Sequence, residues 1–130
     1  MKLATFIRKT GIRTTIERIA ARTDGVKSFG SDSSHFRVTF RLGRKSMTVQ
    51  YSQGSGHNGK MPKAQDVLDC IASDVSGFEG RSFAEWASDS GYSAQPEAQK
   101  TYRMIGRQET ALHSVLGSAL VSELLECERL

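Results

Sequence analysis

The 130-residue sequence contains no apolar run of the length that a membrane-spanning helix needs, which is about 20 residues. It has only two cysteines, Cys70 and Cys127, which are too few for a disulfide framework or for a zinc site without histidines. It has only two prolines, and 38% of its residues are apolar, so disorder along the whole chain is excluded. Residues 1–13 contain neither a continuous apolar stretch nor a cleavage site, and we therefore expect a cytoplasmic protein without a signal peptide.

Positive charge is concentrated in the first half of the chain. Residues 1–60 contain 12 Lys and Arg against 3 Asp and Glu, a balance of +9, whereas residues 61–130 contain 6 against 11, a balance of −5. A basic half is suited to a polyanion or to an acidic protein surface. The same charges also fit two ordinary solvated faces, and composition does not choose between these interpretations.

A period-two alternation of apolar and polar residues over residues 36–51 predicts a β-hairpin. Gly43-Arg44 suits a two-residue type II′ turn, and the turn fixes one register. A slip of one residue would place polar side chains among the apolar ones. The predicted pairs are Leu42–Lys45, Phe40–Met47, Thr39–Thr48, Val38–Val49, Arg37–Gln50 and Phe36–Tyr51.

Start and stop signals divide the rest of the chain into helices. Apolar helical spacing before Gly11 predicts a short first helix, and Ser82 with Glu85 forms a capping box. Residues 12–20 fit a helix and a strand equally, because their β-branched residues also occur at helical spacing. The later helices are predicted over residues 63–76, 82–90, 96–116 and 118–128, with Gly77 ending the first of these.

These elements predict an α+β fold in a single domain over residues 1–130. With residues 12–20 as a strand, residues 1–78 form an α-β-β-β-α core around a three-stranded antiparallel sheet. The helix at residues 63–76 and flanking helices are expected to cover the apolar face of that sheet. Residues 82–130 are expected to form a helical C-terminal extension that packs on the same core.

Two groups of basic residues are candidates for binding a partner. Like charges crowd the hairpin turn, and their mutual repulsion is explained if an anionic partner binds there. The alternative is that they keep the sheet edge unpaired. The glycine-rich loop from Gly54 to Lys60 precedes a helix N-terminus, where backbone N–H groups suit a phosphate, although its spacing is not that of a P-loop. A flexible connection explains that loop equally well. The predicted partner-binding residues are Arg37, Arg41, Arg44, Lys45, His57, Lys60 and Lys63, with Lys100, Arg103 and Arg107 as a secondary candidate.

Two catalytic interpretations are weaker. Asp66, Asp69, Asp74 and Glu79 follow His57 and would suit a metal only if they converged, whereas a solvated helix face explains them more simply. Cys70 with His57 could act as nucleophile and base, but Cys70 is more simply a small buried hydrophobic residue. No nucleophile, base and orienting group stand at a recognisable spacing. We therefore expect no enzyme activity, cofactor, metal or small-molecule substrate.

The predicted order of elements over residues 3–76 resembles that of the double-stranded RNA-binding domain. His35 stands just before the second strand, near the place of that family's minor-groove histidine. Lys60 and Lys63 stand near the start of the last helix, where the family contacts phosphates, although Pro62-Lys63-Ala64-Gln65 replaces its tandem lysines. The resemblance implies a nucleic-acid-binding accessory protein.

Residues 36–130 resemble small proteins of phages and mobile elements, a group largely without assigned function. The resemblance implies an inhibitor of a host defence system, foremost an anti-CRISPR protein that binds the effector complex through a basic surface. The strings that carry it are Met47-Thr48-Val49, Gly54-Ser55-Gly56-His57, Asp66-Val67-Leu68-Asp69-Cys70-Ile71-Ala72-Ser73-Asp74, Phe83-Ala84-Glu85-Trp86, Gly91-Tyr92, Tyr102 and Glu128-Arg129-Leu130.

Overall fold

The computed structural model describes residues 1–19, 34–53, 57, 59–91 and 96–130. Residues 20–33, residues 54–56 and 58 of the glycine-rich loop, and residues 92–95 therefore lie outside the described residues. The elements, in chain order, are α1 (Leu3–Thr10), β1 (Arg13–Ile19), β2 (Ser34–Leu42), β3 (Lys45–Gln53), α2 (Ala64–Phe78), α3 (Phe83–Asp89), α4 (Pro96–Leu116) and α5 (Ser118–Leu125). The predicted α+β class is confirmed.

The three strands form one antiparallel sheet in the order β1-β2-β3. The predicted hairpin register is confirmed at every pair, from Leu42 opposite Lys45 to Phe36 opposite Tyr51. Of the ambiguous residues 12–20, Arg13–Ile19 form strand β1, because pairing with β2 satisfies their backbone groups and suits their β-branched side chains.

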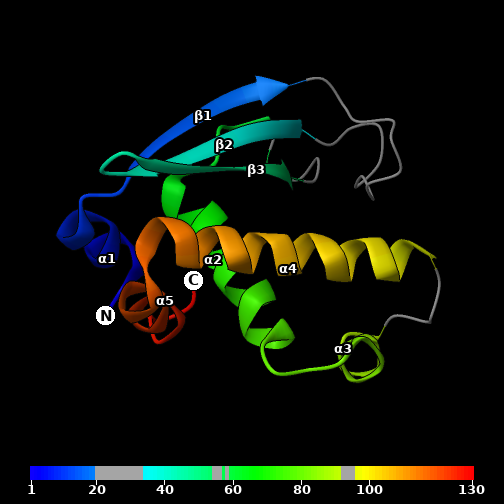
Figure 1. The fold of residues 1–130 in the computed structure, drawn as a ribbon. Coiled ribbons are helices and arrows are strands. Elements are labelled where there is room, and N and C mark those ends of the chain that lie inside the picture. Colours follow the sequence, from blue (N-terminus) through cyan, green and yellow to red (C-terminus); the bar gives the residue numbers. More distant parts are fainter. Residues whose placement is uncertain (20–33, 54–56, 58, 92–95) are drawn as a thin grey trace.

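All the helices lie on one side of the sheet (Figure 1). The inner face of the sheet buries Phe36, Val38 and Phe40 of β2 and also Met47 and Val49 of β3. The buried stripe of α2 joins the same core. Helix α4 lies against β3 and β2, so the longest helix of the predicted C-terminal extension packs directly on the sheet.

The predicted C-terminal extension is divided between two apolar clusters. Leu112 of α4 and Leu124 of α5 are buried in the main core with the sheet. Trp86 of α3 and Ile105 of α4 belong to a second, smaller cluster, which Tyr102 joins. Residues 82–130 therefore complete the main core at one end and form a satellite cluster at the other.

Two predicted helix ends are wrong. Helix α2 continues through Gly77 to Phe78, and the left-handed glycine that follows it is Gly80, with φ of 73°. Helix α5 ends at Leu125. The chain beyond it instead pairs with the N-terminus, where the Glu128 backbone N–H donates to the Met1 carbonyl at 2.9 Å. No helix in the described residues has the length and apolar character needed to cross a membrane.

Candidate binding surface

The outer face of the sheet points away from the helices (Figure 1). The register places polar residues in rows across the strands on this face. Thr15, Thr39 and Thr48 form the middle row, and the hydroxyls of Thr39 and Thr48 lie 3.1 Å apart. In the next row Arg37 donates to the Glu17 carboxylate at 2.8 Å. Among the described residues no helix lies on this face.

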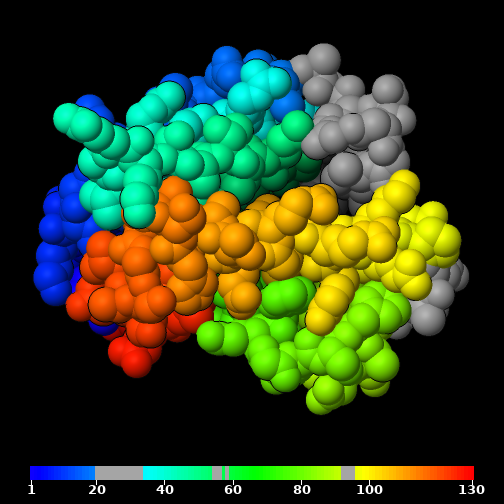
Figure 2. All heavy atoms as spheres, in the orientation of Figure 1, coloured from blue at the N-terminus to red at the C-terminus, as the bar shows by residue number. Residues whose placement is uncertain are grey.

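Three cations gather at the turn between β2 and β3. Arg41, Arg44 and Lys45, which we call the basic tip, are all exposed. Gly43 begins the turn with φ of 61°, a conformation that glycine adopts without a steric penalty. The turn projects from one end of the molecule, at the upper left of Figure 2.

A fourth cation, Arg13, lies beside the basic tip and was not found from the sequence. Arg13 is the first residue of β1 and is directly opposite Arg41 in the register. Both residues are exposed, and like charges in this position destabilise a sheet. The sequence left residues 12–20 open between a helix and a strand. Only the strand interpretation places Arg13 beside Arg41, so a choice of strand would have identified this fourth cation.

The four cations have no acidic partner in the described part of the chain. The ion pairs of that part join Lys9 to Glu123, Arg37 to Glu17, and Arg81 to Asp89. Arg41 donates to the Thr15 hydroxyl at 3.0 Å, which leaves its charge uncompensated. The end of the sheet around the basic tip therefore carries a concentrated positive potential that attracts anionic groups.

His57 and Lys60 lie at the other end of the sheet. Gln53, the last residue of β3, donates to the Lys60 carbonyl at 2.8 Å, and the Lys60 N–H donates to the His57 carbonyl at 3.1 Å. Strand β3 begins at Lys45, and its length at about 3.3 Å per residue separates its two ends by about 25 Å. The structure therefore does not bring the predicted partner-binding residues together in one patch.

Arg18 holds the chain segment that leads into α2. Its side chain lies on the inner face of the sheet, with the guanidinium carbon 5.1 Å from the centroid of the Phe36 ring. The guanidinium donates to the Gly59 carbonyl and, at 3.3 Å, to the Ser34 hydroxyl. This contact ties residues 59–61, which lead into α2, to β1.

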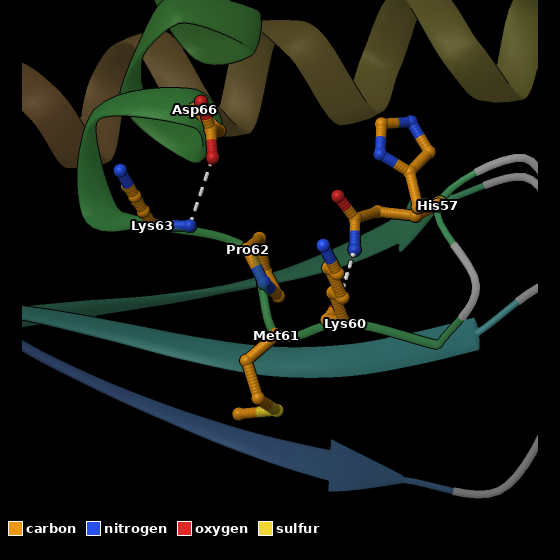
Figure 3. A pocket seen from close by; sticks show the side chains of 7 residues that line it. His57, Lys60, Met61, Pro62, Lys63 and Asp66 are labelled. Atoms are coloured by element: carbon orange, nitrogen blue, oxygen red, sulfur yellow. Dashed lines mark hydrogen bonds between the residues drawn. The ribbon is translucent and has the colours of Figure 1, made fainter.

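The N-terminus of α2 already has an anionic group. The Lys63 backbone N–H donates to the Asp66 carboxylate at 2.9 Å (Figure 3). A carboxylate therefore occupies the place where the resemblance to the double-stranded RNA-binding domain implies a phosphate, and it repels one. His35, the minor-groove histidine implied by that resemblance, is buried in β2, with Nδ1 2.9 Å from the Ser52 hydroxyl.

Two adjoining hollows, of about 330 and 380 Å³, lie between the end of β3 and α2, and Figure 3 shows the first of them. Gln53, His57 and Asp66 line both. The first is completed by Lys60, Met61, Pro62 and Lys63, and the second by Tyr51, Asp69, Cys70 and Leu130. His57, residues 60–63, α2 and Leu130 therefore meet here.

The chemistry of the second hollow does not favour a nucleophilic cysteine. Desolvation of the Cys70 thiol raises its pKa, and the negative charges of Asp74 and Asp69 raise it further. Desolvation also raises the pKa of Tyr51 to about 12. Little thiolate is therefore present at neutral pH. The expectation that Cys70 is a buried residue is wrong, because it stands at the margin of the apolar stripe of α2 and is exposed, whereas Cys127 is buried.

The candidate metal ligands do not converge. Asp66 and Asp69 line the second hollow with His57, but Asp74 and Glu79 are not among its lining residues. Asp74 stands eight positions after Asp66, which is about 12 Å along a helix. No group of three or more His, Cys, Asp or Glu among the described residues is placed to hold a metal ion.

The secondary candidate on α4 is a separate exposed stripe. Lys100, Arg103 and Arg107 are exposed, while the opposite side of α4 buries Ile105 and Leu112. Arg103 and Arg107 stand one turn apart, where like charges repel. None of the ion pairs in the described residues includes a member of this stripe.

No known protein family, no curated protein and no solved structure matches this chain.

Proposed function

We propose that the protein is a non-catalytic inhibitor of a host defence system, foremost a CRISPR effector complex, and that it binds an anionic surface of that complex through the basic tip. The observation that carries the binding site is the crowding of Arg41, Arg44 and Lys45, beside Arg13, without an acidic partner among the described residues. The class of partner rests on the resemblance of residues 36–130 to small phage and mobile-element proteins.

The cost of the arrangement supports binding at the basic tip. Opposed or adjacent like charges on a sheet each cost a few tenths of a kcal/mol or more, and the hydrogen bond from Arg41 to the Thr15 hydroxyl does not remove this repulsion. An anionic partner converts that repulsion into attraction and also raises the association rate. The projecting turn can reach into a groove of a larger partner (Figure 2).

A non-catalytic role is supported by the hollows beside α2. The raised pKa of the Cys70 thiol disfavours nucleophilic chemistry there. Only Asp66 and Asp69 of the four candidate carboxylates line the hollow with His57. The hollow therefore contains polar side chains, but none of them is an activated nucleophile.

Nucleic-acid binding is the second candidate function. The α-β-β-β-α order and the exposed side chains of Lys60 and Lys63 favour it. The carboxylate of Asp66 at the start of α2 and the burial of His35 count against a duplex bound in the manner of the double-stranded RNA-binding domain. A salt series distinguishes the two candidates. Direct phosphate binding weakens by orders of magnitude between about 50 and 200 mM salt.

The test replaces Arg41, Arg44 and Lys45 by Glu in one variant. Binding to the effector complex and inhibition of its DNA cleavage should fall more than about tenfold, since close charge pairs across an interface contribute strongly to affinity and rate. Thermal stability should change little, because the three residues are exposed.

The matched control replaces Lys100, Arg103 and Arg107 by Glu, which changes the net charge equally on the α4 stripe. This variant should retain inhibition. Full inhibition by the tip variant, together with loss in the control, would move the interface to α4. Tight binding of naked duplex without any effect on an effector complex would support the second candidate function instead.

A further inference from the structure

Strand β1 presents an unpaired edge. It pairs with β2 on one side and has no strand on the other among the described residues. Its seven residues, Arg13–Ile19, include no proline, glycine or lysine, and four of the seven are β-branched. Edge strands usually carry proline, lysine or inward-pointing charges that prevent further pairing. The one inward-pointing charge, Arg18, is engaged beneath its own sheet by Phe36 and Gly59.

The exposed side chains of this edge are complementary to themselves. Arg13, Thr15 and Glu17 alternate along the outer face, and all three are exposed. Arg13 faces Arg41 on β2, whereas Glu17 faces Arg37. When the strand is set antiparallel to a copy of itself about Thr15, a basic residue falls opposite an acidic one at two symmetric positions.

We propose that two copies of the chain pair antiparallel along β1, about a twofold axis through Thr15. Arg13 of each copy then lies opposite Glu17 of the other, and Thr15 lies opposite its own counterpart. On the inner face, Thr14 lies opposite Ile16 of the other copy. The two three-stranded sheets become one six-stranded sheet, with both outer faces on the same side.

Charge complementarity selects this register. A pairing centred on Ile16 places Arg13 opposite Ile19 and Glu17 opposite Thr15, and so leaves both charges without an opposed partner. If the twofold axis passed between two residues, each outward-facing residue would lie opposite an inward-facing residue of the other copy. The outer face of one sheet would then continue into the helix-covered face of the other. The register about Thr15 places a carboxylate beside Arg13, on the side away from Arg41, and so relieves the like-charge pair of the monomer.

The test uses two single variants that should each fail to dimerise and should dimerise when mixed. In a dimer of Arg13→Glu, the new carboxylate lies opposite Glu17 of the other copy at both symmetric positions. In a dimer of Glu17→Arg, the new guanidinium lies opposite Arg13 of the other copy at both positions. Each variant alone should weaken dimerisation more than about tenfold. In the mixture both positions again pair opposite charges. Sedimentation velocity over a concentration series should therefore show a wild-type dimer, two monomeric variants and a restored mixed dimer.

A symmetric cross-link gives an independent measurement should a charge variant not fold. Opposed Cα atoms in an antiparallel pair lie about 4.5–5.5 Å apart, a range that a disulfide spans. In a Cys70→Ser background, Thr15→Cys should form a disulfide-linked dimer under mild oxidation. Thr48→Cys, on the same face of β3, is the matched control and should not. A wild-type protein that stays monomeric at the highest concentration would overturn the proposal. The candidate partner of the β1 edge would then be a strand of another protein. Failure of the mixture to dimerise, or equal cross-linking of the two cysteine variants, would also overturn it.

Discussion

Arg18 and Arg37 lie on opposite faces of the same sheet, and their replacement by methionine should affect stability unequally. Arg18 faces the inner side, over the Phe36 ring, and donates to the Gly59 carbonyl. Arg37 faces the outer side, where its ion pair with Glu17 is about half exposed at both side chains. Methionine keeps most of the apolar volume of arginine, so the comparison isolates the polar contacts of each guanidinium.

The expected magnitudes follow from these contacts. A cation–π contact at an exposed position contributes about 0.5–1 kcal/mol. A hydrogen bond from a charged donor contributes about 1.5–3 kcal/mol, and exposure of Arg18 reduces this to about 1 kcal/mol. Arg18→Met should therefore lower the free energy of unfolding by about 1.5–2 kcal/mol. An exposed ion pair contributes about 0.2–1 kcal/mol, so Arg37→Met should cost less than about 1 kcal/mol.

Thermal and urea unfolding measure this difference directly. In a chain of 130 residues, 1 kcal/mol corresponds to a shift in Tm of about 3–5 °C. Arg18→Met should therefore lower the Tm by about 5–10 °C, and Arg37→Met by less than about 5 °C. Hydrogen exchange at the Lys60 amide, which donates to the His57 carbonyl, should accelerate only in Arg18→Met. Equal losses of stability, or accelerated exchange in both variants, would refute the assignment of Arg18 as the anchor of residues 59–61.

Two further predictions concern Tyr51 and Gly43. The pKa of Tyr51 is raised from 10.0 to about 12, so between these pH values the unfolded chain releases a proton that the folded chain keeps, and stability falls as the pH rises. Tyr51→Phe should flatten this decline in urea titrations at pH 10–12 and leave the slope below pH 9 unchanged; an unchanged alkaline slope would contradict the origin assigned to it. Gly43→Ala places a side chain at φ of 61° with no other atom within 4 Å of the new Cβ, so it should lower the free energy of unfolding by about 1 kcal/mol through backbone strain alone. Gly43→Asn should cost less, because asparagine tolerates this conformation, and equal costs would show that the turn has relaxed.

The hairpin was predictable from the sequence because several local signals agree there. Alternation assigns Val38 and Phe40 to one face, and Gly43 requires a turn that has only one register between apolar partners. The Ser82–Glu85 capping box likewise fixed the start of α3 at Phe83. In each case the decisive interactions span only a few positions along the chain.

Where the outcome depends on tertiary contacts, the sequence was insufficient. Gly77 has no left-handed conformation and remains helical. Gly106 of α4 lies under the Phe78 ring, since a Cβ there would be 3.2 Å from that ring, and this packing accompanies the extension of α2 past Gly77. The separation of His57 and Lys60 from the basic tip follows from the length of β3 and from the path that Arg18 imposes. Neither the extension of α2 past Gly77 nor this separation follows from a local sequence pattern.

The like-charge pair of Arg13 and Arg41 connects the two proposed interfaces without making them one. Arg13 has one cross-strand neighbour, Arg41, and is open toward the free edge of β1, whereas Arg41 lies between Arg13 and Ser46 beside the turn. A carboxylate from a second copy can approach only the first, and an anionic partner can approach the basic tip without displacing it. Glu17→Arg, at a position opposite Arg37 and away from the basic tip, should therefore abolish dimerisation while retaining inhibition per monomer. The triple replacement of Arg41, Arg44 and Lys45 should abolish inhibition and preserve the dimer. Loss of both properties in either variant would mean that a single surface carries both.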